Sequence, residues 1–171
     1  MRHWALSAAI GAVILSSGSG SASRAQSIVP AIYDLDQERS DNAFQVIDRA
    51  TTELSVAQRP LARTRLRKSV AVGQIRISLA GSLLGIGYDA KAPIILRIGE
   101  EPIRWTLIKE LAFDVSAVAD GDAVSVRFRG DDSDRTVIYR SVGQNLVEST
   151  TIIGPLLPTP IRFTRFYNRA N

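Results

Sequence analysis

The stretch Val118–Tyr139, which reads VADGDAVSVRFRGDDSDRTVIY, places one run of alternating side chains between two acidic clusters. The apolar members of the run are Val124, Val126 and Phe128, and the polar members are Ser125, Arg127 and Arg129. This alternation is typical of a strand that buries one face. Asp-Gly before the run and Gly-Asp-Asp-Ser after it are turn signals. The stretch therefore predicts a strand with a tight turn at each end.

The acidic clusters also admit three functional interpretations: a metal site, a pair of catalytic carboxylates, or an adhesion motif at 129–131. At ~3.3 Å per residue, Asp122 and Asp131 would lie about 30 Å apart along a strand. One metal ion cannot span that distance, and the two carboxylates of a glycosidase lie closer together. The second cluster also lacks the central Gly and distal Glu of an EF-hand loop. The pattern therefore favours two solvated turns and predicts no metal site.

The same alternation recurs along most of the chain after Pro60. It is found at 66–72, 75–79, 84–88, 94–98, 103–107, 111–115, 124–128 and 137–139, and less regularly at 146–153 and 161–166. Turn signals such as AGS, GEEP and VGQN separate these segments. The pattern predicts a mainly β (α+β) fold, which is either an antiparallel β-sandwich or a small barrel of seven to nine short strands.

One amphipathic helix is expected before the strands, at about 41–58. Its apolar stripe consists of Ala43, Val46, Ile47, Ala50, Leu54 and Ala57. Ser40 is a suitable N-cap, and Pro60 is expected to end the helix. Residues 26–40 contain Pro30 and are interpreted as an extended lead-in. Residues 41–171 then form a single helix-plus-β domain.

Residues 1–25 are predicted to be a cleaved signal peptide. Arg2 precedes an apolar run from Ala5 to Leu15, and small polar residues follow it. The run is too short to cross a bilayer as a helix. Cleavage is expected after Ala25, with Ala22 as the alternative. The predicted location is therefore periplasmic or extracellular.

Cleavage would also remove the only histidine, His3, from a chain that has no cysteine. Without imidazole or thiol, Ser-His-Asp and Cys-His catalysis are excluded, and so are typical zinc sites and His- or Cys-ligated haem. No cofactor is expected. The formal charge falls from +4 to +2, because residues 1–25 hold two arginines and no acidic residue. Such a small positive charge does not indicate a nucleic-acid-binding protein.

Five arginines are the candidate binding residues. Arg63, Arg65 and Arg67 lie in the segment ARTRLRKS (62–69), where they would share one face of a strand. Arg127 and Arg129 lie on the polar face of the strand at 123–129. Together they could bind an anionic partner. The alternative is a solvated edge strand whose charges prevent pairing with another sheet. Trp105 alternates with Ile103 and Leu107, which predicts a packing role.

These features predict an exported, non-enzymatic binding or assembly module of the bacterial periplasm or cell envelope. Its expected partner is an envelope protein or an anionic polymer, either a glycan or lipopolysaccharide, with at most peripheral membrane contact. One alternative is a small integral outer-membrane β-barrel, although the strands are short for crossing and the aromatics form no girdles. A carboxylate-based hydrolase is the weaker alternative, because no pair of acids is singled out.

Overall fold

The computed structural model describes residues 28–108 and 111–171, which form ten strands and two helices. The first elements are β1 (Ala31–Asp36), α1 (Ala43–Ala50), α2 (Arg59–Val70), β2 (Gln74–Ala80), β3 (Leu83–Tyr88) and β4 (Ile94–Arg97). The remaining strands are β5 (Ile103–Ile108), β6 (Leu111–Asp120), β7 (Ala123–Arg129), β8 (Asp134–Val142), β9 (Asn145–Ile153) and β10 (Ile161–Arg169).

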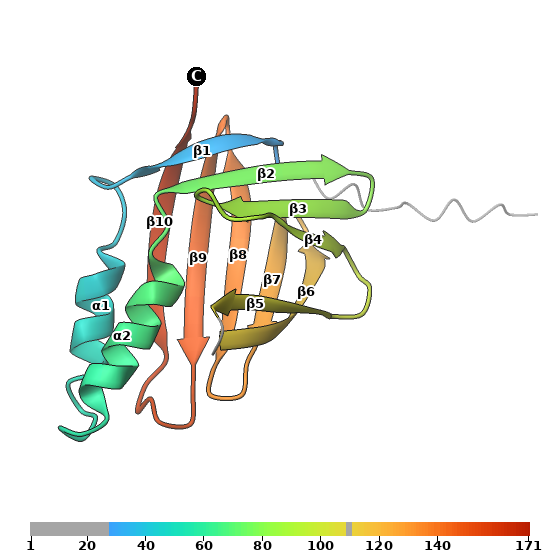
Figure 1. Cartoon of the computed structure of the whole chain (residues 1–171). Helices are drawn as coiled ribbons and strands as arrows, with labels where there is room; N and C mark the ends of the chain where they lie inside the picture. The colour runs from blue at the N-terminus through green and yellow to red at the C-terminus, as the bar shows by residue number, and fades with distance from the viewer. Residues whose placement is uncertain (1–27, 109–110) are drawn as a thin grey trace, which may run out of the picture.

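The strands form one antiparallel sheet in the order β4-β3-β2-β1-β10-β9-β8-β7-β6-β5. Figure 1 shows this sheet curling so that β2 and β3 run across the direction of β8–β10. Strands β4 and β5 are its two edges. The chain just beyond β4 contacts β6, where the Gly99 N–H donates to the Ala117 carbonyl at 2.8 Å. The sheet is therefore a nearly closed barrel.

The barrel is filled by side chains from the inward face of its strands, because alternate residues of each strand point to the same side. In one row across the sheet, Val124, Tyr139, Glu148 and Arg165 are cross-strand neighbours. The largest fully buried side chains include Tyr33, Tyr139, Tyr167, Phe128, Leu84 and Ile86. The outward face carries ion pairs such as Arg104–Asp114 and Arg140–Asp122, both at 3.0 Å.

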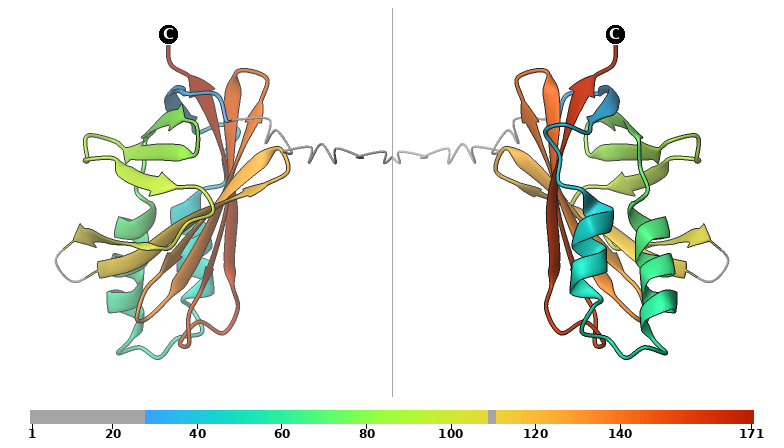
Figure 2. Two further views of the ribbon diagram at one scale, coloured as in Figure 1. Left: turned by 90° about the vertical axis from the view of Figure 1, so that its right-hand side faces the viewer. Right: turned by 90° about the vertical axis from the view of Figure 1, so that its left-hand side faces the viewer.

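The two helices lie side by side against one end of the barrel (Figure 2). Asn42 caps α1 by accepting a hydrogen bond from the Gln45 N–H at 3.1 Å. Ala43 and Ile47 of α1 and Val70 of α2 are buried, and they pack against inward residues of β9 and β10, namely Ile152, Ile161 and Phe163. The helix pair thus covers an apolar part of the inner sheet surface.

The prediction of one helix at 41–58 is wrong in extent. Helix α1 ends at Ala50, and the Thr51 hydroxyl donates to the Ile47 carbonyl at 2.8 Å. Residues 59–70, predicted to begin the strands, form α2, and Pro60 lies in its first turn instead of ending a helix. Proline is well tolerated there because the first N–H groups of a helix have no intrahelical partner.

The predicted strand count is too low by one strand or more. Of the two architectures expected, the barrel is confirmed. The additional strand lies in the expected lead-in, since β1 at Ala31–Asp36 pairs with both β2 and β10. Those residues are extended, as predicted, but they occupy the middle of the sheet order and belong to the domain.

The opening stretch is confirmed as a strand between two turns. Strand β7 spans Ala123–Arg129, and the turn before it contains Gly121 at a φ of 60°. After β7, the Gly130 N–H donates to the Ser133 carbonyl at 2.9 Å. The φ of Gly121 lies in the left-handed region, which costs glycine little because it has no Cβ.

Replacing Phe128 by Ala should destabilise the protein by about 3–5 kcal/mol, because the ring is fully buried and its loss leaves a cavity. Asp131→Asn in the neighbouring exposed turn is the control, with an expected change within about 0.5 kcal/mol. Urea unfolding followed by circular dichroism measures both free energies. A loss below about 1 kcal/mol for Phe128→Ala would contradict a close-packed barrel interior at this position.

Candidate ligand-binding site

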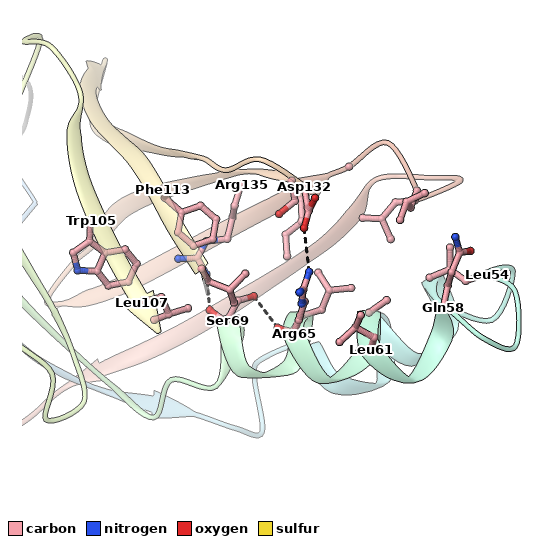
Figure 3. Close-up of a pocket in the computed structure, with 18 residues that line it drawn as sticks. Leu54, Gln58, Leu61, Arg65, Ser69, Trp105, Leu107, Phe113, Asp132 and Arg135 are labelled. Atoms are coloured by element: carbon pink, nitrogen blue, oxygen red, sulfur yellow. Dashed lines mark hydrogen bonds and ion pairs between the residues drawn. The ribbon is translucent and has the colours of Figure 1, made fainter. Parts of the chain in front are cut away.

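A pocket of about 210 Å³ lies between α2 and the helix-covered end of the barrel. Figure 3 shows its lining, which comes from α2 and the chain before it, the β5–β6 hairpin, the β7–β8 turn and β8, and the end of β9 with the following loop. Segments far apart in the sequence therefore build one cavity. Its rim is open, since Leu61 and Leu156 are 58% and 61% exposed.

Most of the lining is apolar. The apolar residues are Leu54, Leu61, Ala62, Leu66, Trp105, Leu107, Leu111, Phe113, Ile152, Leu156 and Leu157. Trp105 packs against the rings of Phe113 and Phe128, with centroids 6.4 and 5.9 Å away. Small-molecule pockets are typically concave and mainly apolar with a few placed polar groups. This pocket is smaller than the ~300 Å³ at which drug-sized sites begin, so it suits a small ligand or the end of a longer one.

A few polar groups complete the lining, and three of them are charged: Arg65, Asp132 and Arg135. Arg65 donates to the Asp132 carboxylate at 3.0 Å, which ties α2 to the β7–β8 turn. Arg135 donates to the Ser69 carbonyl at 2.6 Å and lies over the Phe128 ring, 4.3 Å from its centroid. Its side chain is on the inward face of β8, together with Val137 and Tyr139.

Deeper in the barrel, a buried carboxylate gathers three donors. Glu148 is 2% exposed and Arg165 is 5% exposed. The Glu148 carboxylate accepts from the Arg165 guanidinium at 2.7 Å, the Thr150 hydroxyl at 2.7 Å and the Tyr167 hydroxyl at 2.9 Å. Arg165 also donates to the Val70 carbonyl at 2.8 Å, at the end of α2. The pair therefore joins β9, β10 and α2.

Burial and charge act in opposite directions on this cluster. Burial by itself lowers the pKa of Arg165, but the Glu148 carboxylate holds that pKa above its ordinary value. Burial and the Glu148 charge together raise the pKa of Tyr167 far above its ordinary value. Burial likewise raises the pKa of Tyr88 and Tyr139, whose hydroxyls are 2.7 Å apart. Arg165 is thus charged and the three tyrosines are neutral at physiological pH.

The three arginines predicted on a strand at 62–69 lie on helix α2 instead. Arg63 donates to the Thr51 hydroxyl at 2.9 Å and to the Asp48 carbonyl, and Arg67 forms an ion pair with Asp48. These contacts join α2 to α1. Arg65 reaches the pocket rim through Asp132.

The other two candidates, Arg127 and Arg129, lie on the outward face of β7, where Arg127 pairs with Asp134. The five arginines therefore form two groups on different elements, and a binding role for them stays a prediction. Trp105 packs against the core as expected, but it also lines the pocket.

Sequence reasoning missed Arg135, Glu148 and Arg165. A signal was present, because Glu148 occupies an apolar position of its strand between Leu146 and Ile152, and Arg165 alternates with Phe163 and Tyr167. A charged residue in the buried phase of a strand almost always has a partner. The identity of that partner depends on which strands are neighbours.

Within residues 28–108 and 111–171, no group of three or more acidic, histidine or cysteine side chains is placed to hold a metal ion. None of the helices in that part of the chain combines the length and apolarity needed to cross a bilayer.

Several solved structures resemble this fold. A secretory abundant heat soluble protein from Ramazzottius varieornatus is 12% identical, with a TM-score of 0.56 over 83% of this chain and 94% of that one. A lipid binding protein from Caenorhabditis elegans is 9% identical, with a TM-score of 0.54 over 82% and 94%. The fatty-acid-binding protein of Manduca sexta is 17% identical, with a TM-score of 0.53 over 84% and 100%.

No protein-family model matches the chain, and no curated protein matches it in sequence. At these identities the structural likeness shows the fold alone, a nearly closed barrel.

Replacing Glu148 by Ala should destabilise the protein by about 3–5 kcal/mol, because it leaves the Arg165 charge buried without a counter-ion. Sodium acetate should restore part of this loss, since a free carboxylate fits the vacated position and binds only the folded state. Urea unfolding in acetate and in chloride at equal ionic strength measures the rescue.

Glu100→Ala is the matched control, because Glu100 is exposed and pairs loosely with Arg97 at 3.8 Å. It should change the stability by less than about 1 kcal/mol and show no acetate effect. Equal stability of Glu148→Ala in acetate and in chloride would contradict a carboxylate-specific cluster.

Proposed function

We propose that the protein is a non-enzymatic carrier or receptor that holds a small apolar or amphipathic molecule in the pocket under α2. The observation that carries this proposal is the pocket itself, which has an apolar lining, an open rim and three charged groups at its edge. Burying apolar ligand surface there contributes about 25 cal/mol per Å² before the costs of association.

The fold supports the same proposal, since two of its structural neighbours are named for binding lipids or fatty acids. Fold likeness alone does not establish function. In this chain the inward face of the barrel is packed with its own side chains. The ligand space is therefore the pocket at the helix-covered end, and the proposal rests on that geometry.

The proposed setting is the bacterial periplasm or cell envelope. Its support is the leader pattern at 1–25, which lies outside the described residues, and the charged outward surface of the barrel. The proposed macromolecular partner is an envelope protein or an anionic polymer, which Arg63, Arg65, Arg67, Arg127 and Arg129 would contact. Four of these arginines form partly exposed ion pairs with Asp48, Asp132 or Asp134, and these pairs can exchange for contacts with an anion.

Ligand binding can be tested with N-phenylnaphthylamine, a neutral apolar dye whose fluorescence rises in apolar surroundings. The full chain should bind it saturably. Ala62→Trp should weaken binding at least about tenfold, the effect of losing roughly 1.4 kcal/mol, because the indole fills the pocket.

Thr64→Trp is the matched control, because Thr64 is exposed on the same helix and is not part of the lining. Its dye affinity should equal that of the unchanged chain. Equal affinities for the two tryptophan variants would show that the dye binds elsewhere and would contradict the proposed site.

Export is tested by intact-mass measurement of the protein from fractionated bacterial cells. The envelope fraction should contain a chain that begins at Gln26, and osmotic shock or high salt should release it without detergent. A full-length chain in the cytoplasm would contradict the predicted location. A requirement for detergent, with a heat-dependent gel shift, would favour the outer-membrane alternative.

A further inference from the structure

The charges around the pocket are unbalanced. Among the lining residues, Arg65 and Asp132 form an ion pair and compensate each other. Arg135 is the remaining charged group of the lining. In the described part of the chain, no carboxylate lies within ion-pair distance of its guanidinium. The pocket wall therefore carries one uncompensated positive charge.

The position of Arg135 is set by the sheet. Its cross-strand neighbours are Phe128 on β7 and Ile152 on β9, and both are buried. Arg135 itself is only partly buried. These two apolar neighbours still lower the dielectric constant on one side of its guanidinium, which strengthens its interaction with an anion relative to water. Phe128 supports the guanidinium from one side through its ring.

The Arg135 guanidinium has N–H donors that form no hydrogen bond within the protein. One terminal nitrogen donates to the Ser69 carbonyl in the last turn of α2. A helix C-terminus is a favourable place for a cation, so this contact is by itself a sufficient structural role. The Nε–H, however, is buried without a hydrogen-bond partner. A guanidinium has five N–H donors in a planar fork, which suits the oxygens of a carboxylate, sulfonate or phosphate.

The other inward guanidinium in this region, that of Arg165, already has a counter-ion, although its Nε–H is likewise buried without a hydrogen-bond partner. Arg165 shares the Glu148 carboxylate with the hydroxyls of Thr150 and Tyr167. An incoming anion would have to displace a buried carboxylate there, at a large desolvation cost. At Arg135 it would meet an uncompensated charge beside an open apolar cavity.

We infer that Arg135 anchors the anionic group of the ligand at the pocket wall, and that Glu148 excludes that group from the deeper site at Arg165. The ligand is then a small amphiphile with a carboxylate, sulfonate or phosphate at Arg135. Its apolar part lies against α2 and the β5–β6 hairpin. This inference rests on the proposed function, because it specifies the ligand of the same pocket.

Two dyes with the same aromatic skeleton separate charge recognition from apolar binding. N-phenylnaphthylamine is neutral, and anilinonaphthalene sulfonate adds one anionic group to it. The full chain should bind both. Arg135→Gln should weaken binding of the sulfonate at least about tenfold and leave binding of the neutral dye unchanged. Arg135→Lys keeps the charge without the fork and should lose less.

Arg140→Gln is the matched control, because it removes the same charge from the outward, exposed face of β8, the strand that carries Arg135. It should change neither affinity. A second measurement needs no variant: raising the salt concentration should weaken binding of the sulfonate by the unchanged chain and not that of the neutral dye, because salt screens charge interactions. The absence of a salt effect would contradict the inference even where Arg135→Gln fails to fold.

The outcomes are distinguishable. If neither dye binds the unchanged chain, the proposed function fails, and the inference fails with it. If both bind but Arg135→Gln weakens them equally, Arg135 has only its structural role at the end of α2, and the inference is overturned while the proposed function stands. If the sulfonate affinity is the same in the unchanged chain and Arg135→Gln and is insensitive to salt, the inference is overturned as well.

Discussion

Two hydrogen bonds from the Arg165 guanidinium join the barrel to helix α2. One nitrogen of this guanidinium donates to Glu148 on the neighbouring strand, and another donates to the Val70 carbonyl at the end of α2. On β8, two strands away from β10, Arg135 makes a similar contact with the end of α2 by donating to the Ser69 carbonyl. The last carbonyls of α2 have no partner within their own helix. Two inward-facing arginines of the barrel, the buried Arg165 and the partly buried Arg135, supply donors to them.

The position of the pocket follows from these contacts. They hold the C-terminal end of α2 close to the inner sheet surface, where Val70 is buried. The other end of α2 lies further out, with Leu61 largely exposed, and its apolar face borders open space instead of a strand. Because α2 is held close to the inner sheet surface at one end, a pocket remains between its other end and the barrel, and residues of both line it.

Charge within the barrel explains why the ligand space is at the mouth. Among the described residues, the interior contains one complete ion pair, Glu148–Arg165. Around it are tyrosines and aliphatic side chains whose burial contributes most of the stability. A buried pair of this kind adds little net stability compared with apolar residues, but the loss of either partner is costly. The interior therefore has no place for a second anion. Arg135, which lines the pocket at the helix-covered end of the barrel, remains available to one.

The sequence by itself determined the barrel walls. Residues such as Val124, Val126 and Phe128 recur every second position, and that period places one face of a strand in the core whichever strand lies beside it. Nine strand segments and the turns around 121 and 130 were predictable for this reason. The two-residue period gave a wrong prediction at residues 59–70, which form helix α2. There Ala62, Leu66 and Val70 are spaced four residues apart, which fits a helix better than a strand. A short apolar run is ambiguous when tertiary packing decides its state.

Only the tertiary structure decided the candidate site. The pocket joins α2 with the β5–β6 hairpin and two loops, and no local pattern records that these segments meet. The same is true of Glu148 and Arg165, which are 17 residues apart. Their alternation indicated burial, but their pairing required β9 and β10 to be neighbours in this register. Local periodicity reports whether a side chain is buried, whereas the identity of its contacts depends on which strands and helices the closed barrel brings together.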